Sequence, residues 1–382
     1  MKKKVRILTW LGALLIIAPF VNAQETDASA MKGRIDAAEE RLSVLESDMS
    51  GLKKLKISGY VQARYEIHQD SKDEADTTGK VYKNLDYFYI RRGRVKVTYE
   101  PAASSRFTLQ LDAAKDKVTL KDAEAMVAFP IGNTYPISLR LGQFKWPFSY
   151  DVLRSSSERE MPERTRAIRA LMPGERDRGV QLGYMPNDMF DFNLGLFNGY
   201  GIDNSTYPVI TPTRTPAIVG RATADFELIA VGASVFTGKS AVLGTKDTIN
   251  KKIPFETKDK NRFGGDAQLY YELPVLGGGR IMAEVITGKD WSSSKKDYAN
   301  SLGGYLQLVQ NIWEYDQIMI RYDIWDPDGS VEKDGMNTLG LGLVHHFSGN
   351  AKLTLAYEMP KHQDSEKEKD DNFLTAQLQV KF

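Results

Sequence analysis

Three cations spaced two residues apart form the clearest chemical pattern in the chain. Arg92, Arg94 and Lys96 lie in the segment Tyr87-Phe-Tyr-Ile-Arg-Arg-Gly-Arg-Val-Lys-Val-Thr98. Every second side chain of a β-strand points to the same face, so these three would line one wall at intervals of about 7 Å. Fixed cations along a water-filled passage attract anions and repel cations. The pattern also fits a bracing role, in which the arginines pair with carboxylates on neighbouring strands: Asp112, Asp122 and Glu124.

A long segment without strand periodicity, residues 145–178, holds the second concentration of charge. Loops of this length in compact structures are usually functional. Folded into an interior, this one would narrow a passage, and Arg154 and Arg159 are then candidates for its lining. The alternative is a solvated surface loop whose charges pair among themselves. Its eight basic residues exceed its six acidic ones by two: Lys145, Arg154, Arg159, Arg164, Arg166, Arg169, Arg176 and Arg178 against Asp151, Glu158, Glu160, Glu163, Glu175 and Asp177.

Enzymatic chemistry finds little support. The chain has four histidines, of which His345 and His346 are adjacent in a predicted strand and therefore point to opposite faces. His68 and His362 fall in or near predicted loops. We find no Ser/His/acid arrangement, no metal-ligand spacing and no glycine-rich phosphate loop. The sequence predicts neither an enzyme nor a cofactor or metal site.

The N-terminus has the layout of a cleaved signal peptide over residues 1–23. Four cations precede an apolar run of about 15 residues and a Val21-Asn22-Ala23 cleavage site. The alternative, a membrane anchor, needs roughly 20 apolar residues. Cleavage leaves 47 basic against 50 acidic residues, a balance that does not indicate a nucleic-acid partner. The absence of cysteine excludes a lipid-anchored lipoprotein, thiolate chemistry and disulfides.

Residues 24–54 show a heptad pattern. Apolar side chains alternate spacings of four and three, which is typical of a coiled coil. We predict a short periplasmic helix that joins protomers, or alternatively an amphipathic helix lying on its own barrel. The apolar positions fit none of the patterns that fix the number of helices: Met31, Ile35, Ala38, Leu42, Leu45, Met49 and Leu52.

The last ten residues, Phe373 to Phe382, alternate strictly between apolar and polar side chains and end on an aromatic residue. This period of two indicates a strand. Such a terminal strand resembles the assembly signal of outer-membrane barrels, which predicts the barrel assembly machinery as a partner through Phe382. A soluble edge strand would look similar.

Residues 55–382 divide into sixteen candidate strands joined by short and long connections in turn. An even strand number with both ends on the short-turn side is what bacterial outer-membrane barrels require. A soluble β-sandwich has no need for long connections at one end only. The sequence therefore predicts an all-β fold, a transmembrane antiparallel β-barrel in the outer membrane of a Gram-negative bacterium, wide enough to hold an aqueous channel.

Four segments resemble the phosphate-selective porin O and P family. They are Tyr89-Ile-Arg-Arg-Gly-Arg-Val95, Leu141-Gly-Gln-Phe-Lys-Trp-Pro-Phe148, Arg176-Asp-Arg-Gly-Val-Gln-Leu182 and Leu196-Phe-Asn-Gly-Tyr-Gly201. Their order and spacing carry the resemblance, which covers most of the chain from about residue 55.

The resemblance implies a trimeric, sixteen-stranded porin with a basic constriction fed by its long third loop, and often an N-terminal helical extension. It adds Arg140 and Lys145 to Arg92, Arg94 and Lys96 as candidate lining residues. The expected function is passive diffusion of small, phosphate-like anions through a lipid-embedded homotrimer. A weakly selective porin, and a structural or adhesive barrel without conductance, stay open as alternatives, because the long loop is also rich in glutamate.

Overall fold

The computed structural model describes residues 37–42, 51, 53–70, 74–75, 81–82, 85–114, 117–132, 134–202, 215–243, 255–292, 295–364 and 370–382. The chain divides into two units, Met1–Lys53 and Lys54–Phe382. In the first unit, residues 37–42 are helical, and the side chain of Leu42 is exposed. The predicted signal peptide and most positions of the heptad pattern lie outside the described residues.

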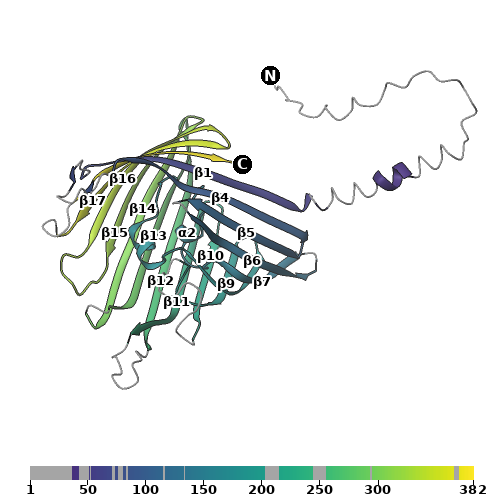
Figure 1. The fold of residues 1–382 in the computed structure, drawn as a ribbon, viewed down its shortest axis with the longest axis horizontal. Coiled ribbons are helices and arrows are strands. Elements are labelled where there is room, and N and C mark those ends of the chain that lie inside the picture. The colour runs from purple at the N-terminus through teal and green to yellow at the C-terminus, as the bar shows by residue number, and fades with distance from the viewer. Residues whose placement is uncertain are drawn as a thin grey trace, which may run out of the picture. The chain divides into compact units, whose positions relative to one another are not determined.

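The second unit is a closed antiparallel barrel of sixteen strands, as the sequence predicted (Figure 1). Each strand pairs with its neighbour in the chain, and the first pairs with the last. A separate two-stranded sheet is formed by β2 (Glu74–Ala75) and β3 (Val81–Tyr82). The barrel strands are β1 (Leu55–His68), β4 (Tyr87–Ala102), β5 (Ser105–Ala114), β6 (Lys117–Ile131), β7 (Thr134–Lys145), β8 (Arg176–Asn187), β9 (Phe190–Phe197), β10 (Ala217–Asp225), β11 (Ile229–Leu243), β12 (Phe255–Leu273), β13 (Gly277–Ser292), β14 (Asp297–Ile312), β15 (Asp316–Asp326), β16 (Met336–Ser348), β17 (Ala351–His362) and β18 (Phe373–Lys381).

Side chains alternate between the two faces of the wall. In β1, Ile57 and Val61 are exposed on the outside, whereas Gln62 and Arg64 are buried inside. Outward aromatic residues gather near the short turns, as in the interfacial girdles of membrane barrels: Tyr99, Phe107, Phe129, Tyr135, Tyr184, Phe192, Phe226, Trp313, Tyr315, Phe347 and Phe382. In the described part of the chain, no helix is long and apolar enough to cross a membrane.

The barrel closes where β1 meets the C-terminal strand. The N–H of Gly59 donates to the carbonyl of Phe382, and the N–H of Phe382 donates to the carbonyl of Gly59, each at 3.0 Å. A Cβ at Gly59 would overlap the carbonyl of Arg94 and the ring of Phe382. A glycine at this position therefore lets the terminal aromatic ring lie against the closing seam.

The hairpin of β11 and β12 is longer than the alternating segments that predict it, residues 229–236 and 262–273. Its backbone pairing continues to Leu243 and from Phe255. Polar residues dominate this extension, where Lys239 forms an ion pair with Asp259. The alternation of apolar and polar residues marks only strand segments with one apolar face, so it stops before the backbone pairing does.

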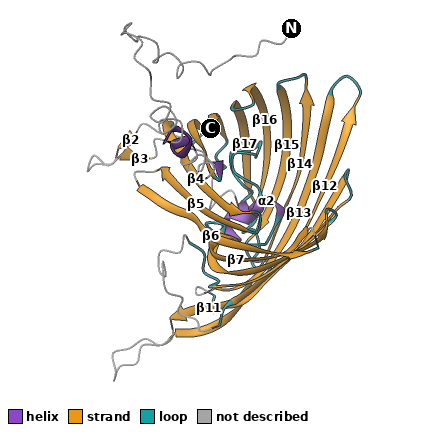
Figure 2. Ribbon diagram, turned by 90° about the vertical axis from the view of Figure 1, so that its right-hand side faces the viewer, coloured by secondary structure: helices purple, strands orange, loops and turns teal. Residues whose placement is uncertain are grey.

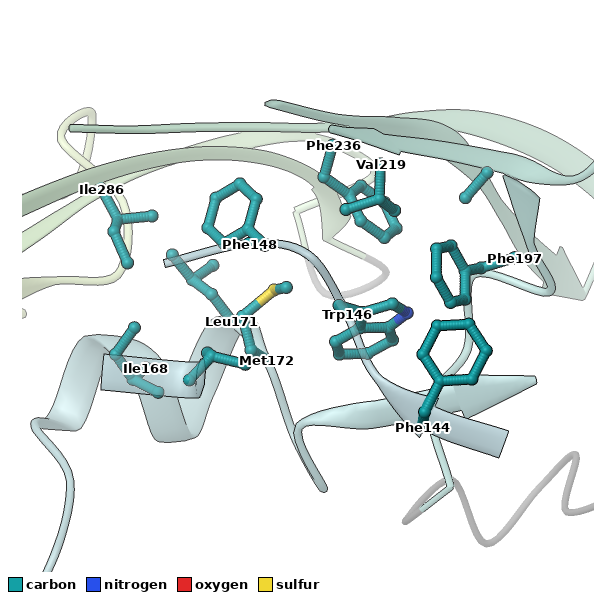
Figure 3. Close-up of a cluster of buried hydrophobic side chains, with 12 residues drawn as sticks. Phe144, Trp146, Phe148, Ile168, Leu171, Met172, Phe197, Val219, Phe236 and Ile286 are labelled. Carbon is teal, nitrogen blue, oxygen red and sulfur yellow. The ribbon is translucent and has the colours of Figure 1, made fainter. Parts of the chain in front are cut away.

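The interior is not aqueous throughout. The connection between β7 and β8, residues 146–175 (the constriction loop), contains α2 (Tyr150–Leu153) and α3 (Arg166–Leu171) and folds into the barrel (Figure 2). Apolar side chains of this loop pack against inward apolar side chains of the wall, among them Val219, Phe236 and Ile286 (Figure 3). Part of the lumen is thus a packed core, whereas the sequence predicted an aqueous channel narrowed by this loop.

Candidate pore constriction

The constriction loop crosses the lumen and bonds to strands far apart in the barrel. The Tyr60 hydroxyl on β1 lies 2.5 Å from that of Ser156. Two strands from β1, Lys352 of β17 donates to the carbonyl of Arg159 at 2.8 Å. Farther around the barrel, the N–H of Asp151 donates to Glu284 of β13 at 3.3 Å. The loop is therefore held across the barrel rather than lying outside it, which agrees with the constriction that the sequence predicted.

Two apolar clusters hold the loop against one side of the wall. The larger one joins loop and neighbouring strand residues to β9, β10, β11 and β13: Phe144, Trp146, Phe148, Val152, Ile168, Leu171 and Met172 with Phe197, Ala217, Val219, Phe236 and Ile286. The smaller one places Met161 among Met282, Tyr305, Val309, Met319, Val344 and Ala356. Burial of this apolar surface fixes the loop on the β9–β17 side. The charged side chains of the loop reach the wall on several sides. Glu163 pairs with Arg64 of β1 and Arg91 of β4. Glu160 pairs with Arg280 of β13, and Glu158 pairs with Lys381 of β18.

Glu163 joins the loop to the basic wall. Its carboxylate lies 2.7 Å from the guanidinium of Arg64, 2.6 Å from that of Arg91 and 3.2 Å from that of Arg92. Burial by itself raises the pKa of Glu163, but Arg92, Arg64 and Arg91 together hold the pKa well below its usual range. The carboxylate is therefore ionised and neutralises part of the arginine charge.

A β-bulge in β4 explains why Arg91 takes part. The pairing of β1 with β4 shifts between Gln62 and Ala63, which face Arg92 and Ile90, so Arg91 is the extra residue. A bulge lets two consecutive side chains point to similar sides. Both Arg91 and Arg92 consequently reach Glu163, whereas strict alternation assigns only the even positions to the lumen.

The three ladder cations have different surroundings. Arg92 and Arg94 are 3% and 8% exposed, and Arg94 donates to Asp112 at 2.8 Å and to Ser156 at 3.0 Å. Lys96 is exposed. The bracing interpretation therefore describes Arg94, whose partner Asp112 lies on the neighbouring strand. Arg92 pairs instead with Glu163 of the loop, and the side chain of Lys96 remains exposed.

The candidates Arg140, Lys145 and Arg154 are also engaged. Arg140 lies 3.4 Å from Glu124, and Lys145 donates to the carbonyls of Leu153 and Arg154 at 2.9 and 2.8 Å. Arg154 donates to both carboxylate oxygens of Glu160, at 3.0 and 3.1 Å. The contacts of Lys145 and Arg154 hold the loop, whereas Arg140 pairs within the wall.

Arg159 is the exception among the buried candidates. Its side chain is 4% exposed, and none of its three guanidinium nitrogens has a hydrogen-bond partner in the described part of the chain. Burial and the nearby cations Arg164 and Arg92 lower its pKa well below the usual range. Its position inside the loop brings positive charge into the barrel, away from the open solvent.

Sequence reasoning did not single out the two most accessible cations of the loop. Arg166 and Arg169 are exposed on α3, three residues apart, and no hydrogen bond or ion pair engages either side chain within the described residues. A spacing of three puts both on one side of a helix. The sequence did not reveal α3, because a helix of six residues inside a long polar loop is too short to show a helical periodicity.

Three cavities surround the loop. The largest, about 910 Å³, lies toward the long connections and is lined by four arginines, four carboxylates and two histidines among the described residues. A cavity of about 410 Å³ on the short-turn side is lined by Arg154, Arg280, Lys352 and Lys381 with Glu158 and Glu160. Between loop and wall, a narrow cavity of about 250 Å³ shares Arg91, Glu163 and Arg169 with the largest one. It thus continues inward from the outer cavity.

The narrow cavity is strongly basic. Of its described lining residues six are basic and two acidic: Arg91, Arg92, Lys121, Arg164, Arg169 and Arg176 against Glu163 and Glu175. Burial raises the pKa of Glu175, but Arg164, Arg176 and Lys145 bring it to about 2. With both acids ionised, the lining residues of the narrow cavity have an excess of four positive charges. In the lining of the large cavity, the four arginines are balanced by four carboxylates, and only the two histidines could add charge.

A sixteen-stranded closed barrel in which the long connection between β7 and β8 folds inward defines the class of outer-membrane porins. Solved structures with this fold include the anion-selective porin from Comamonas acidovorans, at 12% identity and a TM-score of 0.63, covering 86% of this chain and 99% of that one. OprB of Pseudomonas putida is 9% identical with a TM-score of 0.61, covering 91% and 97%. A trimer form of OmpT from Vibrio cholerae is 12% identical with a TM-score of 0.56, covering 86% and 99%. At these identities the likeness concerns the fold.

The sequence itself gives the family. The family described as phosphate-selective porin O and P matches residues 58–250, just over half of the chain. The chain belongs to this family and is an outer-membrane porin of a Gram-negative bacterium. No curated protein sequence matches it.

Proposed function

We propose that the protein lets small anions diffuse passively across the outer membrane through the narrow basic cavity between the constriction loop and the β4–β6 wall. The observation that carries this proposal is the lining of that cavity, in which six basic residues accompany two acidic ones. One of the six, Arg176, pairs with Asp122 of the wall at 2.7 Å. In a confined site with low-dielectric walls, such charge raises the local concentration of anions and repels cations. The name of the Comamonas porin, which is described as anion-selective, supports the same direction of selectivity.

The seven residues singled out by sequence contribute to this passage in different ways. Arg92 and Arg159 supply buried charge beside it, and Arg94, Arg140, Lys145 and Arg154 hold the loop and the wall in place. Lys96 supplies exposed charge on β4. Arg166 and Arg169 on α3 are the proposed entry residues, since they are exposed beside the large outer cavity.

Phosphate-like solutes are the proposed substrates, because the guanidinium group pairs with oxyanions in bidentate geometry. The proposal includes no enzymatic activity and no cofactor. It also includes a signal peptide over residues 1–23, a periplasmic coiled-coil segment over residues 24–54 and a porin domain over residues 55–382. We further propose a homotrimer, supported by the trimer form of the Vibrio porin, and recognition of the Phe382 strand by the barrel assembly machinery.

Planar-bilayer recordings test the proposal directly. Purified protein should form channels, and the reversal potential in a KCl gradient should have the sign of chloride selectivity. With the chloride concentration held constant, added phosphate should then lower the chloride current. The same concentration of a non-binding anion should not. Protein that gives no channels would favour the structural barrel, and a cation-selective reversal potential would remove the anion proposal while leaving a porin.

A further inference from the structure

Three of the four segments that carry the family resemblance meet at one place in the wall. Residues 141–143 of β7, 178–180 of β8 and 196–198 at the end of β9 are neighbours there. On the inner side, the buried carboxylate of Asp177 accepts N–H groups from Arg178 at 2.8 Å and from Gly199 at 2.6 Å. These contacts and the aromatic cluster account for the roles of the inward side chains of the three segments. The outward side chains have no role in them.

The outer side chains surround a groove on the face that meets lipid. The groove has a volume of about 560 Å³, and the leucines that line it include Leu120, Leu141 and Leu196. Leu141 is 62% exposed and Leu196 is 46% exposed on the outside of the barrel. An apolar hollow in the wall leaves room for a flexible hydrocarbon chain.

The polar side chains in the groove have separate roles. The amide of Gln143 is buried and donates to the carbonyls of Leu120 and Lys121 at 2.8 and 2.9 Å, at the irregularity where the pairing of β5 with β6 shifts. The side-chain amide NH2 of Gln143 is therefore already hydrogen-bonded to backbone carbonyls of the wall. The guanidinium of Arg178, by contrast, forms no hydrogen bond or ion pair with any residue that the structure describes, and it is half-buried in the groove.

The position of Arg178 fits the headgroup level of the outer leaflet. It is the third residue of β8, so it lies about 7 Å along the strand from the end that joins the constriction loop. That end faces the outside, because bacterial barrels have their short turns in the periplasm. A charged side chain facing hydrocarbon is costly and usually reaches the interface or a partner of opposite charge.

We propose that this groove binds an acyl chain of a phosphorylated outer-leaflet lipid, with Arg178 paired to the phosphate. The apolar walls match the chain, and the single guanidinium matches the headgroup charge. The inference rests on the membrane location of the barrel and not on its ion selectivity, so either can fail without the other.

Native mass spectrometry of the detergent-purified porin tests this site with diphosphorylated, hexa-acylated lipid A as the probe. Wild-type protein should retain lipid A in preference to dephosphorylated lipid A. Arg178→Gln should weaken retention about tenfold, the effect of one charge-assisted hydrogen bond. Leu141→Trp, which fills the groove, should weaken retention as well. Leu306→Trp is the matched control, since Leu306 is 57% exposed on β14 outside the groove.

Several results would overturn the proposal. Equal retention of the phosphorylated and dephosphorylated probes by wild-type protein would remove the role of the phosphate without any substitution. Unchanged retention by Arg178→Gln, or equal losses in Leu141→Trp and Leu306→Trp, would place the lipid elsewhere. The chain lacks cysteine, so Arg178→Cys offers a single thiol; efficient cross-linking between protomers would show that a second copy covers the groove. Heat-modifiable migration on gels confirms folding of each variant.

Discussion

The basic residues of the constriction differ in how much of their charge is available to a solute. Arg64, Arg91 and Arg92 share the carboxylate of Glu163. Arg166 and Arg169 keep their charge exposed on α3. A buried guanidinium that is paired contributes little field outside its pair, whereas an exposed one acts directly on an approaching ion. Selectivity should therefore be most sensitive to the α3 pair.

Reversing the charge of this pair should reduce anion preference. In the double variant Arg166→Glu, Arg169→Glu, we expect the anion-to-cation permeability ratio to fall on the order of tenfold, because the local field that concentrates anions changes sign. Bilayer reversal potentials measure the ratio. Lys333→Glu with Lys361→Glu is the matched control, because these lysines are also exposed but line none of the three cavities. An equal effect in the control would contradict a local role of α3.

The selectivity contributed by the narrow cavity should be independent of pH between about pH 8 and pH 5. Both acids of the narrow cavity have depressed pKa values, about 2 for Glu175 and well below normal for Glu163. A depressed pKa means that the ion pairs contribute their full stability above the unfolded value of about 4.3 and lose it as the pH falls through the folded value. Reversal potentials across this range test the expectation. If the reversal potential does shift with pH, and His68→Gln with His362→Gln abolishes that shift, selectivity would instead be located in the large outer cavity.

At the scale of elements, the constriction loop behaves as part of the barrel core. Its apolar residues pack against inward side chains of β10, β11 and β13 (Figure 3). Its polar residues bond to β1 and β17. Interiors packed in this way resist displacement, because moving the loop would expose apolar surface and leave polar groups unpaired. The passage should consequently have a stable width.

Truncating one side chain of this core should loosen the loop. Phe236 on β11 is fully buried in the cluster, and Phe236→Ala should cost about 3–5 kcal/mol by analogy with other core truncations. We expect a lower unfolding temperature on heat-modifiability gels and larger fluctuations of single-channel current. Phe263→Ala removes the same ring from the outer face of β12, where it is 59% exposed. If both variants behave alike, the inner cluster does not hold the loop.

At the scale of the whole molecule, closure depends on the contact between the first and last strands. Nine residue pairs join β1 to β18, and Gly59 accommodates the terminal ring of Phe382 beyond them. Complete closure removes free strand edges, which a membrane does not tolerate. The terminal aromatic residue therefore has a structural role in the finished barrel in addition to the proposed recognition during assembly.

Crowding this seam should lower the yield of folded barrel. Gly59→Val introduces a side chain that overlaps the Arg94 carbonyl and the Phe382 ring, and we expect a severalfold smaller heat-modifiable fraction in outer membranes. Gly265→Val is the control, since nothing lies within 4 Å of the Cβ that it would add. Normal yield of Gly59→Val would show that the seam can adjust.

The sequence by itself determined the barrel, its sixteen strands, the length of the loop that narrows it and the positions of most cations. These features depend on local alternation and on connection lengths, which can be read along the chain. It did not determine which cations are accessible. Arg91 enters the lumen only through the bulge in β4, and Arg92 is neutralised in part by Glu163, 71 residues away.

Only the tertiary structure decided where the narrow basic cavity lies. The loop packs on the β9–β17 side because its apolar residues meet Val219, Phe236 and Ile286 there, and this leaves the basic cavity beside β4 and β6. Such contacts join residues distant in sequence, and no periodicity records them. The pairing of charges across the lumen likewise depends on the path of the loop, so the effective charge of the pore is a property of the folded molecule.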